Sequence, residues 1–167
     1  KANDSDRLDI ETPEGSVSAT RTTVDHVPQE IQPVSDEVLE MFRDLSELGP
    51  EFAKSYVPGS SESGLKLYDQ AFSAWQLAES KAHSDQQVVE ILGGVLGNRL
   101  VDDFDMEWVV VHDEYGVDYA VRGKTIDVMA FPFSTVLKRI TNVEHDFMYG
   151  VYYTVKDRIA SGEYTER

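Results

Sequence analysis

Hydrophobic positions follow two different spacings along the chain, and the spacing changes near residue 105. Before that point apolar residues recur every three or four positions, which is typical of one face of a helix. The pattern predicts helices over 35–48, 65–81 and 85–103, with a short turn, helical or irregular, at 50–56. Ser35 is a suitable N-cap for the first helix, and Ser84 with Gln87 forms a capping box at the start of the third.

Between residues 106 and 131 apolar and polar positions alternate instead, which indicates strands. We expect strands over 106–113, 117–122 and 125–131, joined by tight turns. Two more helices are expected after them, over 132–142 and 145–161. The order of elements predicts an α+β fold, in which N-terminal helices precede a three-stranded antiparallel meander and C-terminal helices pack on the sheet.

Residues 1–34 differ in composition from the rest of the chain. They contain no Phe, Trp or Tyr but hold three of the six prolines, so they can bury little apolar surface. We expect a flexible or extended polar arm here, followed by a single domain over 35–167. Apolar and polar residues alternate around Ile10 and Val17, so a short edge strand within this arm is an alternative. The protein is expected to be cytoplasmic, or exported after removal of an N-terminal segment, and both locations stay open.

The third predicted helix contains the unusual run Gly93-Gly94-Val95-Leu96-Gly97. Three glycines inside a helix cost about 3 kcal/mol relative to alanine, so a compensating interaction is expected. Gly93 and Gly97 share one helix face, where a neighbouring backbone or an aromatic ring such as that of Trp75 could approach closely. A phosphate-binding loop is not indicated, because no strand precedes the run and no Gly-Lys-Ser/Thr follows it.

Composition and charge exclude several classes of protein. The chain has 31 acidic and 15 basic residues, a formal net charge of -16, which disfavours nucleic-acid binding. It has no cysteine, which excludes disulfide scaffolds, zinc ribbons and thiol catalysis. No apolar run approaches the roughly 20 residues that a membrane span needs. The sequence therefore predicts a soluble protein that does not bind nucleic acid.

No set of residues has the spacing of a catalytic or metal site. Asp102, Asp103, Asp105 and Glu107 form an acidic corner that lacks the glycine and bidentate glutamate of a calcium-binding loop. The four histidines do not stand at metal-ligand spacings, and there is no Gly-x-Ser-x-Gly motif. We therefore expect no cofactor, no metal and no identifiable catalytic residue.

The second half of the chain resembles a known family. The similar segments are Leu92-Gly93, Leu96-Gly97, Glu107-Trp108-Val109-Val110, Asp113-Glu114-Tyr115-Gly116, Phe131-Pro132 and Lys138-Arg139. Over about residues 85–160 they resemble the bacterial domain-of-unknown-function family 3806. The resemblance implies a bacterial origin and one integral unit from the third helix onward. It implies no activity, because the family has no assigned catalytic residues.

The leading hypothesis is a small acidic, non-catalytic binding or inhibitor-type protein that blocks a basic protein partner. It rests on the net charge and on Tyr149 and Tyr153, which fall outside the apolar stripe of the last helix and are either covered from a second side or exposed. The same charge could also serve solubility alone.

Two alternatives remain open. One is an enzyme or small-ligand carrier with its site between sheet and helices, at Glu107, His112, Arg122, Lys138 and Arg139. The other is a self-assembling structural domain with a twofold seam on the last helix. The sequence leaves the oligomeric state open.

Overall fold

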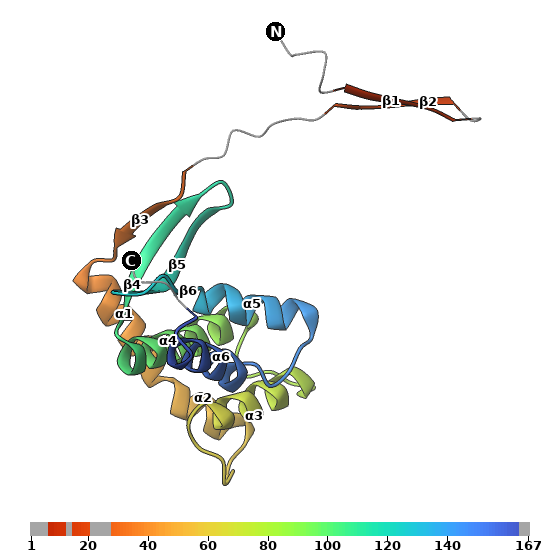
Figure 1. Cartoon of the computed structure of the whole chain (residues 1–167). Helices are drawn as coiled ribbons and strands as arrows, with labels where there is room; N and C mark the ends of the chain where they lie inside the picture. Colours follow the sequence, from red (N-terminus) through yellow and green to blue (C-terminus); the bar gives the residue numbers. More distant parts are fainter. Residues whose placement is uncertain (1–6, 13–14, 21–27, 164–167) are drawn as a thin grey trace.

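The computed structural model describes residues 7–12, 15–20 and 28–163 (Figure 1). Within them lie six helices: α1 (Asp36–Glu47), α2 (Gly49–Tyr56), α3 (Gly64–Leu77), α4 (Asp85–Phe104), α5 (Pro132–Asn142) and α6 (Met148–Ala160). The strands are β1 (Arg7–Thr12), β2 (Gly15–Thr20), β3 (Glu30–Pro33), β4 (Met106–Asp113), β5 (Gly116–Gly123) and β6 (Met129–Ala130). The predicted α+β fold class is confirmed.

Helix α4 is the centre of the helical part, with α1, α2, α5 and α6 packed around it (Figure 1). Ten of its residues are buried, so it is covered on most of its circumference, as expected for a helix that is apolar nearly all round. Its N-terminus has the predicted capping box between Ser84 and Gln87. None of the helices in the described ranges is long and apolar enough to span a membrane.

The main sheet has four antiparallel strands in the order β3-β4-β5-β6, rather than the three predicted. The additional strand is β3, in which Ile31 lies opposite Val111 and packs on the small cluster that Val111 forms with Val109. The third predicted strand, 125–131, is reduced to Met129–Ala130. It is short because the chain turns tightly before it: Val128 N–H donates to the Ile126 carbonyl (3.0 Å), so residues 124–128 do not run alongside β5.

The N-terminal residues contain two elements of their own. β1 and β2 pair as a separate antiparallel sheet in which Ile10 lies opposite Val17. The strand expected as an alternative around Ile10 and Val17 is therefore present, and it forms part of a hairpin. β3 shows that residues 30–33, assigned to the arm, belong to the main sheet. The prediction of a flexible arm falls partly on residues 1–6, 13–14 and 21–27, which lie outside the described part of the chain.

Two helices differ from their predicted ranges because of contacts distant in sequence. α3 ends at Leu77 rather than near residue 81, since the Trp75 indole donates to the carbonyl of His83 (3.0 Å) and the chain turns back toward the helix. α6 begins at Met148 rather than near residue 145. Asp146 has φ +55°, which is not a right-handed helical backbone conformation, and the N–H of Met148 donates to Asp69 on α3 instead of to a preceding carbonyl of the same helix.

The glycines of α4 let aromatic rings pack against the helix backbone, which confirms the expected close approach. A Cβ on Gly97 would overlap the indole of Trp108, and a Cβ on Gly93 would overlap the ring of Phe133. The two rings stack on each other with centroids 5.6 Å apart. The approaching rings therefore come from β4 and α5, and not from Trp75. They join the sheet to the central helix.

Candidate functional site

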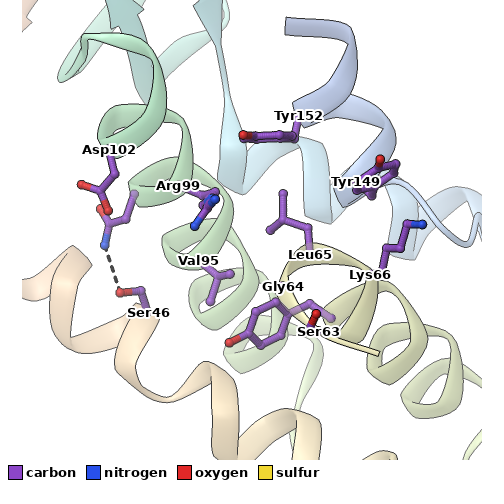
Figure 2. Close-up of a pocket in the computed structure, with 12 residues that line it drawn as sticks. Ser46, Ser63, Gly64, Leu65, Lys66, Val95, Arg99, Asp102, Tyr149 and Tyr152 are labelled. Atoms are coloured by element: carbon purple, nitrogen blue, oxygen red, sulfur yellow. Dashed lines mark hydrogen bonds between the residues drawn. The ribbon is translucent and has the colours of Figure 1, made fainter. Parts of the chain in front are cut away.

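A groove of about 490 Å³ lies between α1, α3, α4 and α6 (Figure 2). We call it the interhelical groove. Its walls combine tyrosine rings, aliphatic side chains and two cationic side chains. The lining residues are Ser46, Ser63, Gly64, Leu65, Lys66, Tyr68, Val95, Asn98, Arg99, Asp102, Tyr149 and Tyr152.

Asn98 connects this groove to the hydrophobic core. Its side-chain amide donates to the Phe42 carbonyl (3.0 Å) and to the Ser46 hydroxyl (3.0 Å), and its oxygen accepts the Trp108 indole N–H (2.9 Å). Three elements, α1, α4 and β4, are thereby joined through one side chain. Because its polar atoms already bond to the protein, Asn98 has a structural role in the groove.

The cationic side chains of the groove lie against tyrosine rings. The Lys66 ammonium lies 4.7 Å from the ring centroid of Tyr149, and the Arg99 guanidinium lies 5.8 Å from that of Tyr152. Arg99 is also paired with Asp103 (2.9 Å), which accepts the Tyr152 hydroxyl (2.6 Å). This hydrogen bond to Asp103 is the main cause that raises the pKa of Tyr152 above its usual value.

A second cavity, of about 530 Å³, shares Lys66 and Tyr149 with the interhelical groove and extends toward the start of α6. Asp69 lines it and is only 5% exposed. Its two carboxylate oxygens accept the backbone N–H groups of Met148 (2.7 Å) and Tyr149 (2.9 Å). Burial raises the pKa of Asp69, although these backbone hydrogen bonds lower it. Asp69 therefore caps α6 from α3 and sets the position of Tyr149.

Tyr149 and Tyr153 lie side by side on α6, with ring centroids 6.0 Å apart. Their exposed fractions are 40% and 52%. Of the two arrangements that the sequence left open for the last helix, covered or exposed, the structure shows the exposed one. We call these two residues the tyrosine pair.

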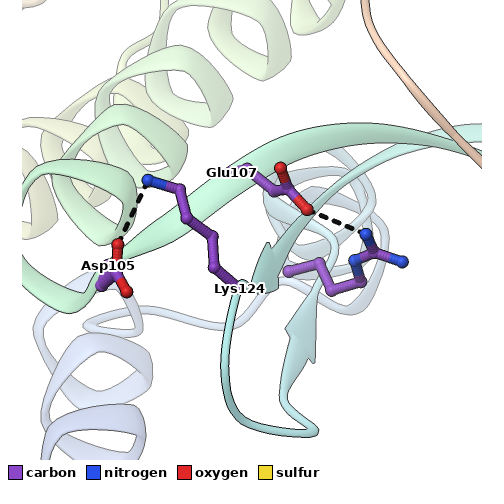
Figure 3. A network of polar contacts seen from close by, with 4 residues as sticks. Asp105, Glu107 and Lys124 are labelled. Atoms are coloured by element: carbon purple, nitrogen blue, oxygen red, sulfur yellow. Dashed lines mark hydrogen bonds and ion pairs between the residues drawn. The ribbon is translucent and has the colours of Figure 1, made fainter. Parts of the chain in front are cut away.

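The enzyme or carrier hypothesis located a site between sheet and helices. Aromatic rings fill the space between β4 and the central helix α4, whereas a cavity of about 670 Å³ remains between β5 and α5. Phe42 lies 4.4 Å from Trp108 and 5.1 Å from Phe133, measured between ring centroids. Glu107 and Arg122 lie on the opposite, outer face of the sheet, where they form an ion pair of 2.8 Å (Figure 3). Beside them Lys124 pairs with Asp105 at 3.1 Å.

The other three candidate residues have separate surroundings. His112 lies opposite Val117 in β5 and Glu30 in β3. Lys138 lines a cavity of about 670 Å³ beside β5. Arg139 pairs with Glu144 (2.9 Å), and its guanidinium lies 5.8 Å from the ring centroid of Phe147. The structure thus brings Glu107 and Arg122 together and places His112, Lys138 and Arg139 at separate positions.

Asn98 and Asp69 were not singled out from the sequence. Asn98 stands in a helix next to the glycine run, and Asp69 is one of 31 acidic residues. The only local signal is that Asp69 stands close to the apolar residues Ala71 and Phe72, which are buried in α3. In the part of the chain that the structure describes, no three or more His, Asp or Glu side chains are arranged to hold a metal ion.

Comparisons with known proteins confirm the family resemblance and the fold. Residues 71–152 match DUF3806, a domain of unknown function. None of the curated proteins compared matches the chain. A crystal structure from Bacteroides thetaiotaomicron VPI-5482, at 1.50 Å resolution, is similar with a TM-score of 0.58 and 14% identity. The match covers 84% of this chain but only 52% of that protein, and at this identity it shows the fold alone.

Proposed function

We propose that this chain, which belongs to DUF3806 over residues 71–152, is a small acidic, non-catalytic binding protein for a basic protein partner. The observation that carries the proposal is the tyrosine pair, two neighbouring rings left exposed on α6 beside two cavities. Tyrosines are enriched at protein interfaces, since each ring buries a large apolar area and loses little conformational entropy.

The charges around the tyrosine pair favour a positively charged partner. Glu62, Asp69 and Asp146 line the cavity next to Tyr149, and Lys66 is the one cationic side chain that lines it. The net charge of -16 extends this negative potential over the whole protein. Such a field speeds association with a basic surface and makes the rate depend on ionic strength.

A co-precipitation experiment tests this proposal. The wild-type protein and the double variant Tyr149→Gln/Tyr153→Gln are each used to capture proteins from an extract of the source organism, at 50 and at 500 mM salt. Glutamine keeps the helix propensity high while removing both rings. We expect the wild type to retain a protein of high isoelectric point at low salt. The double variant and the high-salt wash should both lose it.

Leu77→Gln is the matched control, because Leu77 is a 78% exposed apolar residue at the end of a different helix. It should retain the partner as the wild type does. Retention of the same partner by the double variant, or a partner that resists 500 mM salt, contradicts the proposal. Sedimentation at micromolar concentration tests the self-assembling alternative, which requires a dimer that the double variant does not form.

A second candidate function, a small-ligand carrier, is supported by the interhelical groove. Its volume of about 490 Å³ lies within the range of ligand sites, and Lys66 and Arg99 line it together with three tyrosines. A ligand with a carboxylate and an aromatic ring suits this lining. Calorimetric titration with phenylacetate and indole-3-acetate tests it. A measurable affinity that weakens in Lys66→Gln supports a carrier, and no heat at millimolar ligand contradicts it.

A further inference from the structure

β5 is paired along its whole length on one side only. All its residues, Gly116–Gly123, lie opposite residues of β4. On the other side β6 pairs with Val121 and Arg122 and goes no further (Figure 1). Among the described residues, no strand therefore lies beside Gly116–Ala120 on the β6 side of the sheet.

The hydrogen bonds at the end of β5 show which backbone groups face this open side. Gly123 N–H donates to the Val128 carbonyl (2.9 Å), on the β6 side, whereas the next residue, Lys124, donates to Asp105 on the opposite side. Along a strand, the backbone N–H groups of successive residues point alternately to the two neighbouring positions in the sheet, so every second N–H faces the same side. The N–H groups of Val117 and Tyr119 therefore point toward the open edge.

One side chain from β5 itself occupies part of this edge. Asp118 accepts the N–H of Tyr119 with one carboxylate oxygen (2.8 Å). Its other oxygen accepts the hydroxyl of Ser134 on α5. The donor that a longer β6 would use is thus satisfied by a carboxylate, and freeing it requires Asp118 to release Tyr119 N–H and the Ser134 hydroxyl but breaks no backbone hydrogen bond of the sheet.

A cavity of about 670 Å³ extends along the same edge. One wall is formed by Val117 and Asp118, and the other by Phe131, Ser134 and Lys138. Val117 is 64% exposed, which is high for an aliphatic residue inside a strand. There is space beside β5 for another extended chain.

The opposite edge of the sheet is better protected. There β3 is only four residues long and ends at Pro33, which has no N–H to offer a further strand. Short edge strands and proline are common protections against unwanted strand pairing. The contrast indicates that the β5 edge is the one available for pairing.

We propose that the open edge of β5 binds an extended, positively charged segment of another protein, which adds a strand to the sheet next to Gly116–Ala120. The carboxylates of Asp113 and Asp118 line the cavity against the single amine of Lys138, so the lining favours lysine or arginine at the contact positions. On binding, Asp118 turns from Tyr119 N–H to the incoming cation, and the N–H bonds a carbonyl of the added strand. The proposal rests on the proposed function in one respect, that the partner is basic. It uses a different surface, the edge of β5 and not the tyrosine pair.

A titration followed by the backbone amide signals of the labelled, full-length protein tests this inference. The probe is the peptide acetyl-Thr-Lys-Val-Lys-Val-Lys-Thr-amide, and the control peptide has glutamate in place of each lysine. We expect the lysine peptide to shift the amide signals of Val117 and Tyr119 and to slow their exchange with solvent at least fivefold. The glutamate peptide should bind at least tenfold more weakly.

Backbone pairing is tested first by modifying the peptide, which leaves the protein itself unchanged. Two versions of the lysine peptide carry N-methyl groups at alternate residues, in the two possible registers. Strand addition requires that one version lose binding at least tenfold while the other retains most of it, because only one set of N–H groups faces β5. A second comparison uses Val117→Pro, which removes an edge N–H, against Val117→Thr, which keeps it.

Three results would overturn the inference: no shift at Tyr119 with the lysine peptide, equal binding of the glutamate peptide, or no loss of binding with either N-methylated version. The double variant Tyr149→Gln/Tyr153→Gln should bind the lysine peptide as the wild type does. Loss of the captured partner in that variant with peptide binding intact, or the reverse, separates failure of the proposed function from failure of this site.

Discussion

The indole of Trp108 lies directly against Gly97, at the place that a side chain on residue 97 would occupy. The same indole donates its N–H to Asn98, the next residue of α4 (2.9 Å). One turn of the helix thus offers a flat backbone surface to the ring and an acceptor to its polar atom. This contact fixes the distance between sheet and central helix.

Gly97→Ala should destabilise the protein by about 1–3 kcal/mol, since the added methyl group displaces a buried ring. This loss should appear although alanine is intrinsically the better helix former by about 1 kcal/mol. Urea unfolding followed by circular dichroism measures it. Gly150→Ala is the matched control, because a Cβ there meets no atom within 4 Å, and it should stabilise the protein. A neutral Gly97→Ala would contradict the close approach.

Asn98→Leu should destabilise the protein by about 1–3 kcal/mol, because it leaves the buried indole N–H of Trp108 without its acceptor and removes the donor from Asn98 to the Phe42 carbonyl. The loss should be smaller when the indole donor is removed as well. A double-mutant cycle with Trp108→Phe, measured by urea unfolding, tests this. Additive effects of the two substitutions would show that the hydrogen bond contributes nothing.

Asp69 should make stability fall as the pH rises. Burial raises its pKa in the folded protein above its usual value of 3.8, so the folded state binds the proton more tightly than the unfolded state. Its stabilising contribution is complete below pH 3.8 and is lost as the pH rises through the raised pKa. Asp69→Asn removes this dependence.

The measurement is the difference in unfolding free energy between wild type and Asp69→Asn from pH 3.5 to 7. As the pH increases, the unfolding free energy of the wild type should fall relative to that of Asp69→Asn. A shift in the opposite direction would mean that the hydrogen bonds from Met148 and Tyr149 outweigh burial. Asp146→Asn is the control, because Asp146 only raises the pKa of Asp69 through its charge and should reduce the pH dependence without abolishing it.

Glu107→Gln should change stability by less than about 1 kcal/mol. Glu107 and Arg122 are paired at 2.8 Å, but their side chains are 39% and 21% exposed, and ion pairs at a protein surface contribute little. Thermal unfolding in low and high salt measures the effect, and the small difference should vanish in high salt. A loss above 2 kcal/mol would indicate a role for Glu107 beyond this pair.

The helices and the β4–β5 hairpin could be predicted because their signals are local. Ser35 and Ser84 cap helices where expected, and the alternation at Trp108 and Val110 marks β4. The number of strands was wrong because β3 carries only one half-buried apolar side chain, Ile31, whose partner Val111 is 80 positions away in the chain. The shortening of β6 comes from the turn in which Val128 N–H bonds to the Ile126 carbonyl, which the alternation of apolar and polar residues did not show.

The candidate site was predicted less well than the fold. The position of Tyr149 and Tyr153 outside the apolar stripe of α6 is a local property, but the sequence left open whether they are covered, and the structure shows that they are exposed. The cavities depend on how the helices around them are placed: Asp69 joins α3 to α6, and Asn98 joins α4 to α1. Neither residue can be distinguished in the sequence from other polar residues, because each acts on backbone groups of a distant element.

The amino-acid sequence by itself determined the type and order of most elements and the requirement that something pack closely against Gly93 and Gly97. The spacing of apolar residues and helix capping act over a few residues, so they can be recognised in the sequence without knowledge of the fold. Only the tertiary structure decided that Phe133 and Trp108 fill those places, that Asp69 caps a helix 79 residues later, and that β5 keeps an open edge. These features depend on which distant residues compete for the same space and the same hydrogen bonds, and that competition is resolved only when the whole chain is packed.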